Sequence, residues 1–242
     1  MEEILYHKFF EIEDSYWWFV VRNKMIARIL KQNYNLKPDD ILLDIGCGTG
    51  AFLNLLKDQC IAYGSDMSEI ALDYCSQRGL DNLIKVDLGQ EVKYPDRINF
   101  ITILDVVEHI ENDNEFMKNV YEISSKDGLV IVTVPAYQWL WSKHDELNMH
   151  FRRYSRKQII NLLIHSGFKI EFSSYFYSLL LFPAIIKRFI DKIFKSQKEE
   201  AVIEEVSEGM NKLLTKIFTI ETNRLPNLNF PFGLSALIIA RK

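Results

Sequence analysis

The sequence of 242 residues has few cysteines, no excess of basic residues and no long apolar run. Its three cysteines show no C-x-x-C spacing, which argues against a disulfide framework and a thiolate zinc site and favours a reducing compartment. A net charge of −4 gives no broad attraction for nucleic acid, so we expect no nucleic-acid partner. No apolar run approaches the ~20 residues of a membrane span, and the acidic first segment is unlike a signal peptide. These features predict a cytoplasmic protein.

Short apolar runs alternate with helical patterns through most of the chain. Runs of this length between helices predict a parallel sheet covered on both faces, and hence an α/β fold. The expected strands are 41–45, 61–65, 83–87, 98–104 and 129–134, with 168–174 and 234–240 completing the sheet. The expected helices are 17–33, 50–58, 68–78, 113–125 and 156–166, the last ended by Gly167 as C-cap.

Residues 176–225 interrupt this alternation with two apolar helical patterns, the second over 210–222. The first has an apolar stripe that includes Phe182, Ile186 and Ile190, and lysine and arginine on the opposite face. Three interpretations stay open: a helical pair packed on its own domain, a dimer contact, or a cationic helix that meets a membrane surface or closes over a lipid-like substrate. The membrane contact would run through 182–195, and the oligomeric state is left open.

The run "LLDIGCGTGAF", residues 42–52, predicts a strand that ends near Asp44 and turns through closely spaced glycines into a helix. Glycines let the backbone approach a ligand, and the helix start offers free N–H groups. Gly46, Gly48 and Ala51 also satisfy the dinucleotide pattern G-x-G-x-x-A, so a nicotinamide enzyme stays an alternative. A turn that serves packing alone is another. Asp66, after the second strand, suits ribose hydroxyls in either enzyme.

Acidic residues also follow the third and fourth strands. Asp87 ends the third, where an acid can accept from an adenine amine, and "ILDVVEHI" spans the end of the fourth. A helical turn starting at Asp105 would place Asp105, Glu108 and His109 on one face. We therefore expect at least one of them to point into a pocket at this edge of the sheet.

In this combination the sequence resembles the class I S-adenosylmethionine-dependent methyltransferases over about residues 16–175 and the final strand. The resemblance implies a Rossmann-like sheet of seven mostly parallel strands with the last antiparallel, helices on both faces, and a helical insertion before the last strand. It implies one methyltransferase domain over 1–242, with a helical lid over 1–35, a cofactor core over 36–175, an insertion over 176–228 and a closing strand over 229–242. S-adenosylmethionine is the implied cofactor and S-adenosylhomocysteine the product.

The same resemblance assigns the cofactor-binding residues. The glycine loop would wrap the methionine part, Asp66 would hold the ribose, and Asp87 with Leu88 would recognise the adenine. Arg22, in an aromatic helix that can roof the pocket, would pair with the cofactor carboxylate. The full set is Arg22, Asp44, Gly46, Gly48, Gly50, Asp66, Met67, Asp87, Leu88 and Asp105.

Three of the five histidines follow the fourth and fifth strands, at the edge where open α/β sheets bind ligands. Neutral histidine is a suitable base for an acceptor hydroxyl or ammonium. The candidate catalytic residues are His109, His144 and Glu108, with His109 or His144 as the base. The acceptor entrance would be lined by Tyr137, His150, Arg152, Arg153 and Tyr154, from a run similar to one in little-characterised members of the family. Its paired arginines suit a phosphate or carboxylate, unless its charges pair among themselves.

This stretch also resembles the ubiquinone-pathway and small-RNA O-methyltransferases, in which a Glu-x-x-Glu-His motif binds metal. Here the first acid is the shorter Asp105, so we expect no metal, and we assign one, if bound, to Glu108, His109 and His144. The sequence thus predicts methyl transfer from S-adenosylmethionine to a small or lipid-linked acceptor, with oxygen favoured over nitrogen. The alternatives are a nicotinamide oxidoreductase and a non-catalytic module that binds S-adenosylmethionine.

Overall fold

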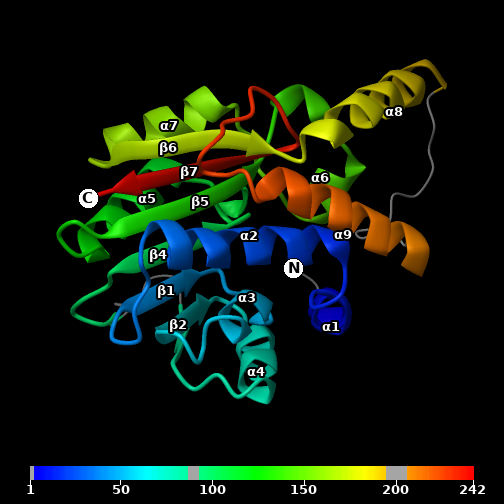
Figure 1. The fold of residues 1–242 in the computed structure, drawn as a ribbon. Helices are drawn as coiled ribbons and strands as arrows, with labels where there is room; N and C mark the ends of the chain where they lie inside the picture. The colour runs from blue at the N-terminus through cyan, green and yellow to red at the C-terminus, as the bar shows by residue number, and fades with distance from the viewer. Residues whose placement is uncertain (1–2, 87–92, 195–205) are drawn as a thin grey trace.

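A seven-stranded sheet forms the centre of the computed structural model, which describes residues 3–86, 93–194 and 206–242 (Figure 1). The strand order is β3-β2-β1-β4-β5-β7-β6. The first five strands run parallel, and β7 pairs antiparallel with both β5 and β6. This confirms the predicted mostly parallel sheet with an antiparallel last strand. The strands are β1 Ile41–Ile45, β2 Ile61–Asp66, β3 Leu83–Lys85, β4 Phe100–Leu104, β5 Leu129–Pro135, β6 Lys169–Phe176 and β7 Ser235–Arg241.

Helices surround the sheet at most of the predicted positions (Figure 1). α6 was not predicted, α1 lies within the predicted helical lid but was not predicted as a separate helix, and α3 is shorter than the predicted 50–58. The helices are α1 Glu3–Ile12, α2 Trp17–Asn33, α3 Ala51–Asn54, α4 Glu69–Gln77, α5 Asp113–Ile123, α6 Lys143–Leu147, α7 Arg156–His165, α8 Leu181–Phe194 and α9 Glu208–Thr222. Three short 3-10 turns are η1 Val107–His109, η2 Gln138–Leu140 and η3 Ser178–Leu180.

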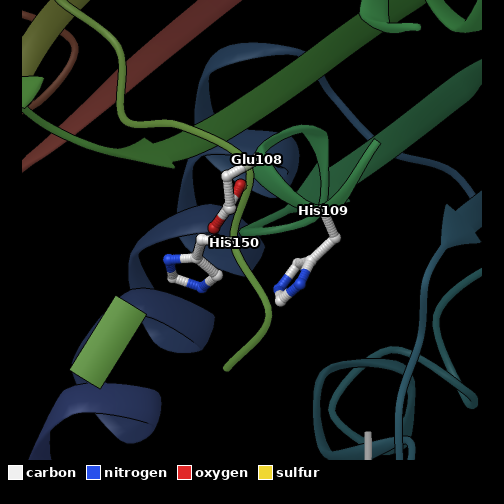
Figure 2. A group of neighbouring side chains, drawn as sticks. All are labelled: Glu108, His109 and His150. Atoms are coloured by element: carbon white, nitrogen blue, oxygen red, sulfur yellow. The ribbon is translucent and has the colours of Figure 1, made fainter. Parts of the chain in front are cut away.

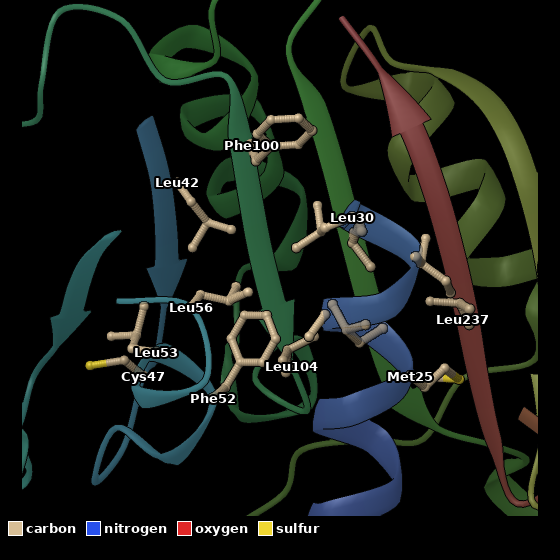
Figure 3. Packing of buried hydrophobic residues seen from close by; sticks show 14 of the residues in the cluster. Met25, Leu30, Leu42, Cys47, Phe52, Leu53, Leu56, Phe100, Leu104 and Leu237 are labelled. Carbon is tan, nitrogen blue, oxygen red and sulfur yellow. The ribbon is translucent and has the colours of Figure 1, made fainter. Parts of the chain in front are cut away.

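Apolar residues fill both faces of the sheet because neighbouring strand residues point to opposite sides. Leu42 packs in one buried cluster with α2 and α3 residues, whereas Leu43 packs in a second cluster with α5 and α7 residues. Figure 3 shows the first cluster, in which Leu30 of α2 lies near Phe100 and Leu104 of β4. The two layers fix the carboxyl ends of the strands along one edge.

The two helices of the 176–225 segment differ in their surroundings. α9 packs beside α2, with Phe218 buried against Trp17. Its Glu221 accepts hydrogen bonds from the backbone N–H of Ser178, which ties it to η3. α8 instead projects from the body (Figure 1). Among the described residues no helix is both long and apolar enough to span a bilayer.

Candidate functional site

The glycine loop after β1 is shaped by three residues in the left-handed region, Gly46, Gly48 and Gly50, with φ of 71°, 54° and 85°. A side chain at Gly46 would lie 2.5 Å from a methyl of Val106, so this glycine is needed for the close approach of β1 and the β4 loop. The loop leads into α3, which leaves its N-terminal amides at the carboxyl edge of the sheet. Such a loop can hold a ligand close to its backbone.

Asp66 ends β2 directly beside this loop. One carboxylate oxygen accepts the N–H of Gly48 at 3.0 Å, and the other accepts the N–H of Ser68 at 2.9 Å. The adjacent Met67 is exposed. Asp87 and Leu88, the predicted adenine contacts, lie outside the described residues.

Asp44 and Asp105 lie at the carboxyl edge, one in β1 and one after β4. Asp44 is buried and accepts a hydrogen bond from the Thr102 hydroxyl at 2.6 Å, and burial raises the pKa of its carboxyl to about 7. Asp105, with φ of 58°, accepts hydrogen bonds from Arg22 of α2 at 2.5 Å and from the Thr133 hydroxyl at 3.0 Å. Arg22 thereby places α2 over this edge.

Three side chains converge next to Asp105, and we call Glu108, His109 and His150 the edge cluster. The η1 turn supplies Glu108 and His109, and the segment after β5 supplies His150. One ligand atom from each lies within 4.8 Å of the others, and the two imidazole rings meet edge to face at 4.6 Å. Figure 2 shows the three side chains facing one another. Asp105 does not share a face with Glu108 and His109 as expected. The left-handed backbone of Asp105 directs its carboxylate to Arg22 instead.

Burial controls the charge of the edge cluster. Glu108 is buried, and its Oε2 has no hydrogen-bond partner among the described residues. Burial, reinforced by the charge of Asp105, raises the pKa of Glu108 well above its ordinary value. Burial and the nearby His150 lower the pKa of His109 to about 4, so this imidazole is neutral at pH 7. The edge cluster therefore offers a neutral imidazole beside an unsatisfied carboxyl oxygen.

A buried carboxylate orients His150. Asp145 lies 2.9 Å from Nδ1 of His150 and also accepts hydrogen bonds from Arg153 and from the N–H of Ser142. Burial would raise the pKa of Asp145, but the hydrogen bonds from His150 and Arg153 outweigh it and hold this pKa below its ordinary value. The ionised carboxylate can only accept, so Nδ1 of His150 carries the hydrogen in this contact and Nε2 is the nitrogen that Asp145 does not occupy.

Much of the chain matches a known protein family. Residues 20–171, more than half of the chain, match the family described as "Methyltransferase domain". The chain belongs to this methyltransferase family. The match confirms the expected methyltransferase family, and it favours methyl transfer over the nicotinamide alternative.

Relatives of this methyltransferase act on different acceptors. A ubiquinone biosynthesis O-methyltransferase of Rickettsia bellii is 28% identical over 118 residues, which cover 47% of this chain and 49% of the relative. The match thus spans about half the length of that relative. A SAM-dependent methyltransferase of Archaeoglobus fulgidus has the same fold, with a TM-score of 0.56, 20% identity and coverage of 91% and 94% of the two chains.

A third similar protein has been solved with its ligands. It is a phosphoethanolamine N-methyltransferase of Haemonchus contortus in complex with phosphomonomethylethanolamine and S-adenosylhomocysteine. The TM-score is 0.59 at 18% identity, with coverage of 91% of this chain and 52% of that chain. At this identity the likeness shows the fold of the methyltransferase and not its acceptor.

The structure places the predicted acceptor residues of the methyltransferase unevenly. His150 joins the edge cluster, whereas His144, one of the two predicted bases and a ligand only in case a metal is bound, does not. Arg152 donates to Asp113 at 2.9 Å and to the Glu111 carbonyl at 2.7 Å. The buried Tyr154 also donates to Asp113, and Tyr137 stacks on Tyr175 at 5.1 Å. The side chains of all three predicted acceptor residues in this run, Arg152, Arg153 and Tyr154, thus donate hydrogen bonds to carboxylates of the chain itself. This agrees with the alternative in which the charges of the run pair among themselves.

The structure also reveals residues of the methyltransferase site that the sequence analysis missed. Glu13, between α1 and α2, accepts hydrogen bonds from the hydroxyl of Thr49 in the glycine loop and from Arg78. Arg78 in turn donates to the Thr49 carbonyl at 2.7 Å and to Asp14 at 2.6 Å. Thr49 was visible within the glycine motif, but nothing in the sequence linked it to Glu13. These contacts fasten the N-terminal segment to the cofactor loop.

Proposed function

We propose that this methyltransferase transfers the methyl group of S-adenosylmethionine to an oxygen of a small or lipid-like acceptor. The observation that supports transfer to an acceptor with a removable proton best is the edge cluster with its Asp145–His150 pair, because a hydroxyl or an ammonium must lose its proton when it is methylated. The similarity to a ubiquinone biosynthesis O-methyltransferase supports oxygen as the acceptor atom.

In this proposal the cofactor lies along the carboxyl ends of β1, β2 and β4. The glycine loop approaches its methionine part, and Asp66 accepts hydrogen bonds from the ribose hydroxyls in addition to those from Gly48 and Ser68. Arg22 lies at Asp105 and pairs with the cofactor carboxylate through the guanidinium edge that Asp105 leaves available. Asp87 and Leu88 remain the predicted adenine contacts.

His150 acts as the base in the proposed reaction. Methyl transfer from a sulfonium is an in-line displacement, so the enzyme aligns the acceptor and receives its proton. Asp145 fixes the tautomer of His150 and stabilises the imidazolium that forms, while Nε2 takes the proton. His109 lies edge to face with His150 and stays neutral, which orients the acceptor without adding positive charge near the sulfonium. His150 replaces His144 in this role because only His150 reaches the edge cluster.

The edge cluster also fits a divalent cation. Glu108 has a buried oxygen without a partner, His109 is neutral, and the carboxylate of Asp145 supports His150 as outer carboxylates support metal-binding histidines. The residues that would hold the ion are Glu108, His109 and His150. Because Asp145 occupies Nδ1 of His150, the ion would bind Nε2 and replace His150 as the base, since a bound ion would lower the pKa of an acceptor hydroxyl.

Transfer of labelled methyl from S-adenosylmethionine into an extract of the source cells tests the proposal. We expect labelled product with wild-type protein, in the organic phase for a lipid-like acceptor and in the aqueous phase for a soluble one. Mass spectrometry of the product then assigns the methylated atom. Binding of S-adenosylhomocysteine without transfer would support the non-catalytic alternative, and a methylated nitrogen would contradict the oxygen assignment.

A further inference from the structure

One end of the molecule carries an unusually exposed group of large apolar side chains. Leu179, Phe182, Ile186 and Ile190 are between 48% and 59% exposed and recur every three or four residues along η3 and α8. This spacing puts them on one face of the helix that projects from the body (Figure 1). Single exposed apolar residues are common in soluble proteins, but a continuous stripe of four indicates an interaction surface.

An aromatic residue from another segment widens the stripe. The ring of Phe232 lies 5.7 Å from that of Phe182, edge to face, and is itself exposed. We call these residues the apolar patch: Leu179, Phe182, Ile186, Ile190 and Phe232.

The apolar patch lies at the same edge of the sheet as the edge cluster. β6 leads into η3 and α8, and it runs in the same direction as β4 and β5 because β7 is antiparallel to both β5 and β6. α8 also contacts the segment that carries His150, through a hydrogen bond from Arg188 to the carbonyl of Leu140. A surface bound at the patch would therefore lie on the acceptor side of the molecule.

We propose that the apolar patch docks on the surface of a bilayer that contains anionic lipids. The sequence of α8 contains Lys187, Arg188 and Lys192 but a single acid, Asp191, in a chain whose net charge is −4. Helices that lie in a membrane surface carry lysine and arginine opposite an apolar face, and these cations bind anionic headgroups. The docked molecule would reach the head of a lipid-like acceptor while its tail stays in the bilayer. This last step rests on the proposed function, whereas docking itself does not.

Flotation with vesicles of phosphatidylcholine, with and without phosphatidylglycerol, tests the proposal. We expect the protein to float with the anionic vesicles at low salt and to dissociate at high salt. Replacing both Phe182 and Ile186 by serine should lower the partition coefficient by about tenfold or more, because two apolar side chains no longer enter the interface. Ile164→Ser is the matched control, since Ile164 is 53% exposed on α7, outside the patch, and this variant should bind as wild type does.

Thermal unfolding and affinity for S-adenosylhomocysteine check that each variant is folded. Absence of flotation, or equal flotation of wild type and the double variant, would overturn the proposal. A dimer that the double variant dissociates, without vesicle binding, would also overturn it and assign the patch to a second copy. The assay contains no methyl donor, so failure here leaves the proposed methyl transfer intact, and failure of methyl transfer leaves docking intact.

Discussion

Arg22 donates a hydrogen bond to Asp105 across 2.5 Å, which joins α2 to the end of β4. Both side chains are largely shielded from solvent, and Asp105 also accepts from Thr133 of β5. The pair therefore links the roof of the site to two strands of the sheet. It also holds a guanidinium at the place where the cofactor's methionine part is proposed to lie.

Removing this guanidinium should weaken cofactor binding. Arg22→Ala is expected to raise the Kd of S-adenosylhomocysteine by more than about tenfold, because charge-assisted hydrogen bonds are lost and Asp105 is left without its partner. Calorimetry measures the change, with Lys24→Ala on the exposed face of α2 as the control. Wild-type affinity in Arg22→Ala would remove Arg22 from the cofactor site.

The ribose contact is tested at Asp66. Asp66→Ala should weaken binding of S-adenosylhomocysteine by more than about tenfold, because it removes both the ribose contact and the bond from Gly48 that holds the glycine loop. The exposed Asp73 of α4 gives the control Asp73→Ala, which should bind as wild type does. Equal affinities in the two variants would show that Asp66 does not contact the cofactor.

Cation binding by the edge cluster has a direct optical readout. Cobalt(II) added to the protein should give visible absorption bands from nitrogen and oxygen ligands, and His150→Ala should lower its affinity by about tenfold or more. His144→Ala should leave the titration unchanged, because His144 lies outside the edge cluster. If wild-type protein shows no such bands, the edge cluster does not bind the cation, and its proposed role is limited to proton transfer.

The lowered pKa of His109 predicts a pH dependence of stability. Between pH 4 and 6.5 the unfolded chain binds a proton at this histidine that the folded chain does not, so the free energy of unfolding falls as the pH decreases. Above about pH 6.5 the contribution of His109 is complete. Denaturant unfolding at about pH 7.5 and pH 5 should therefore show a smaller loss of stability in His109→Asn than in wild type. An equal loss in the two proteins would show that His109 titrates normally.

The sheet was predictable because its signals are local. The central strands β1, β4, β5 and β7 are short apolar runs, and α2 was found at Trp17–Asn33, as its periodicity predicted. α1 lacked such a signal, since its helix is fixed by distant partners. Phe10 of α1 stacks on Tyr74 at 4.5 Å, and the guanidinium of Arg78 lies over the Phe10 ring. Sequence periodicity carries no information about such contacts.

The candidate site was only partly predictable for the same reason. Glu108 and His109 were identified because they directly follow a buried strand. The choice between His144 and His150 depends on the short helix α6, whose capping box joins Ser142 to Asp145 and turns Asp145 toward His150. The S-x-x-D spacing was present in the sequence, but the contact that selects His150 arises only when the segment after β5 folds against η1.

The most direct test of the account compares His150→Gln and His144→Gln with wild type in methyl transfer from labelled S-adenosylmethionine, with the Kd of S-adenosylhomocysteine measured on the same preparations. We expect the rate to be about a hundredfold or more lower in His150→Gln at unchanged cofactor affinity, and close to wild type in His144→Gln. A wild-type rate in His150→Gln, or a loss confined to His144→Gln, would contradict it.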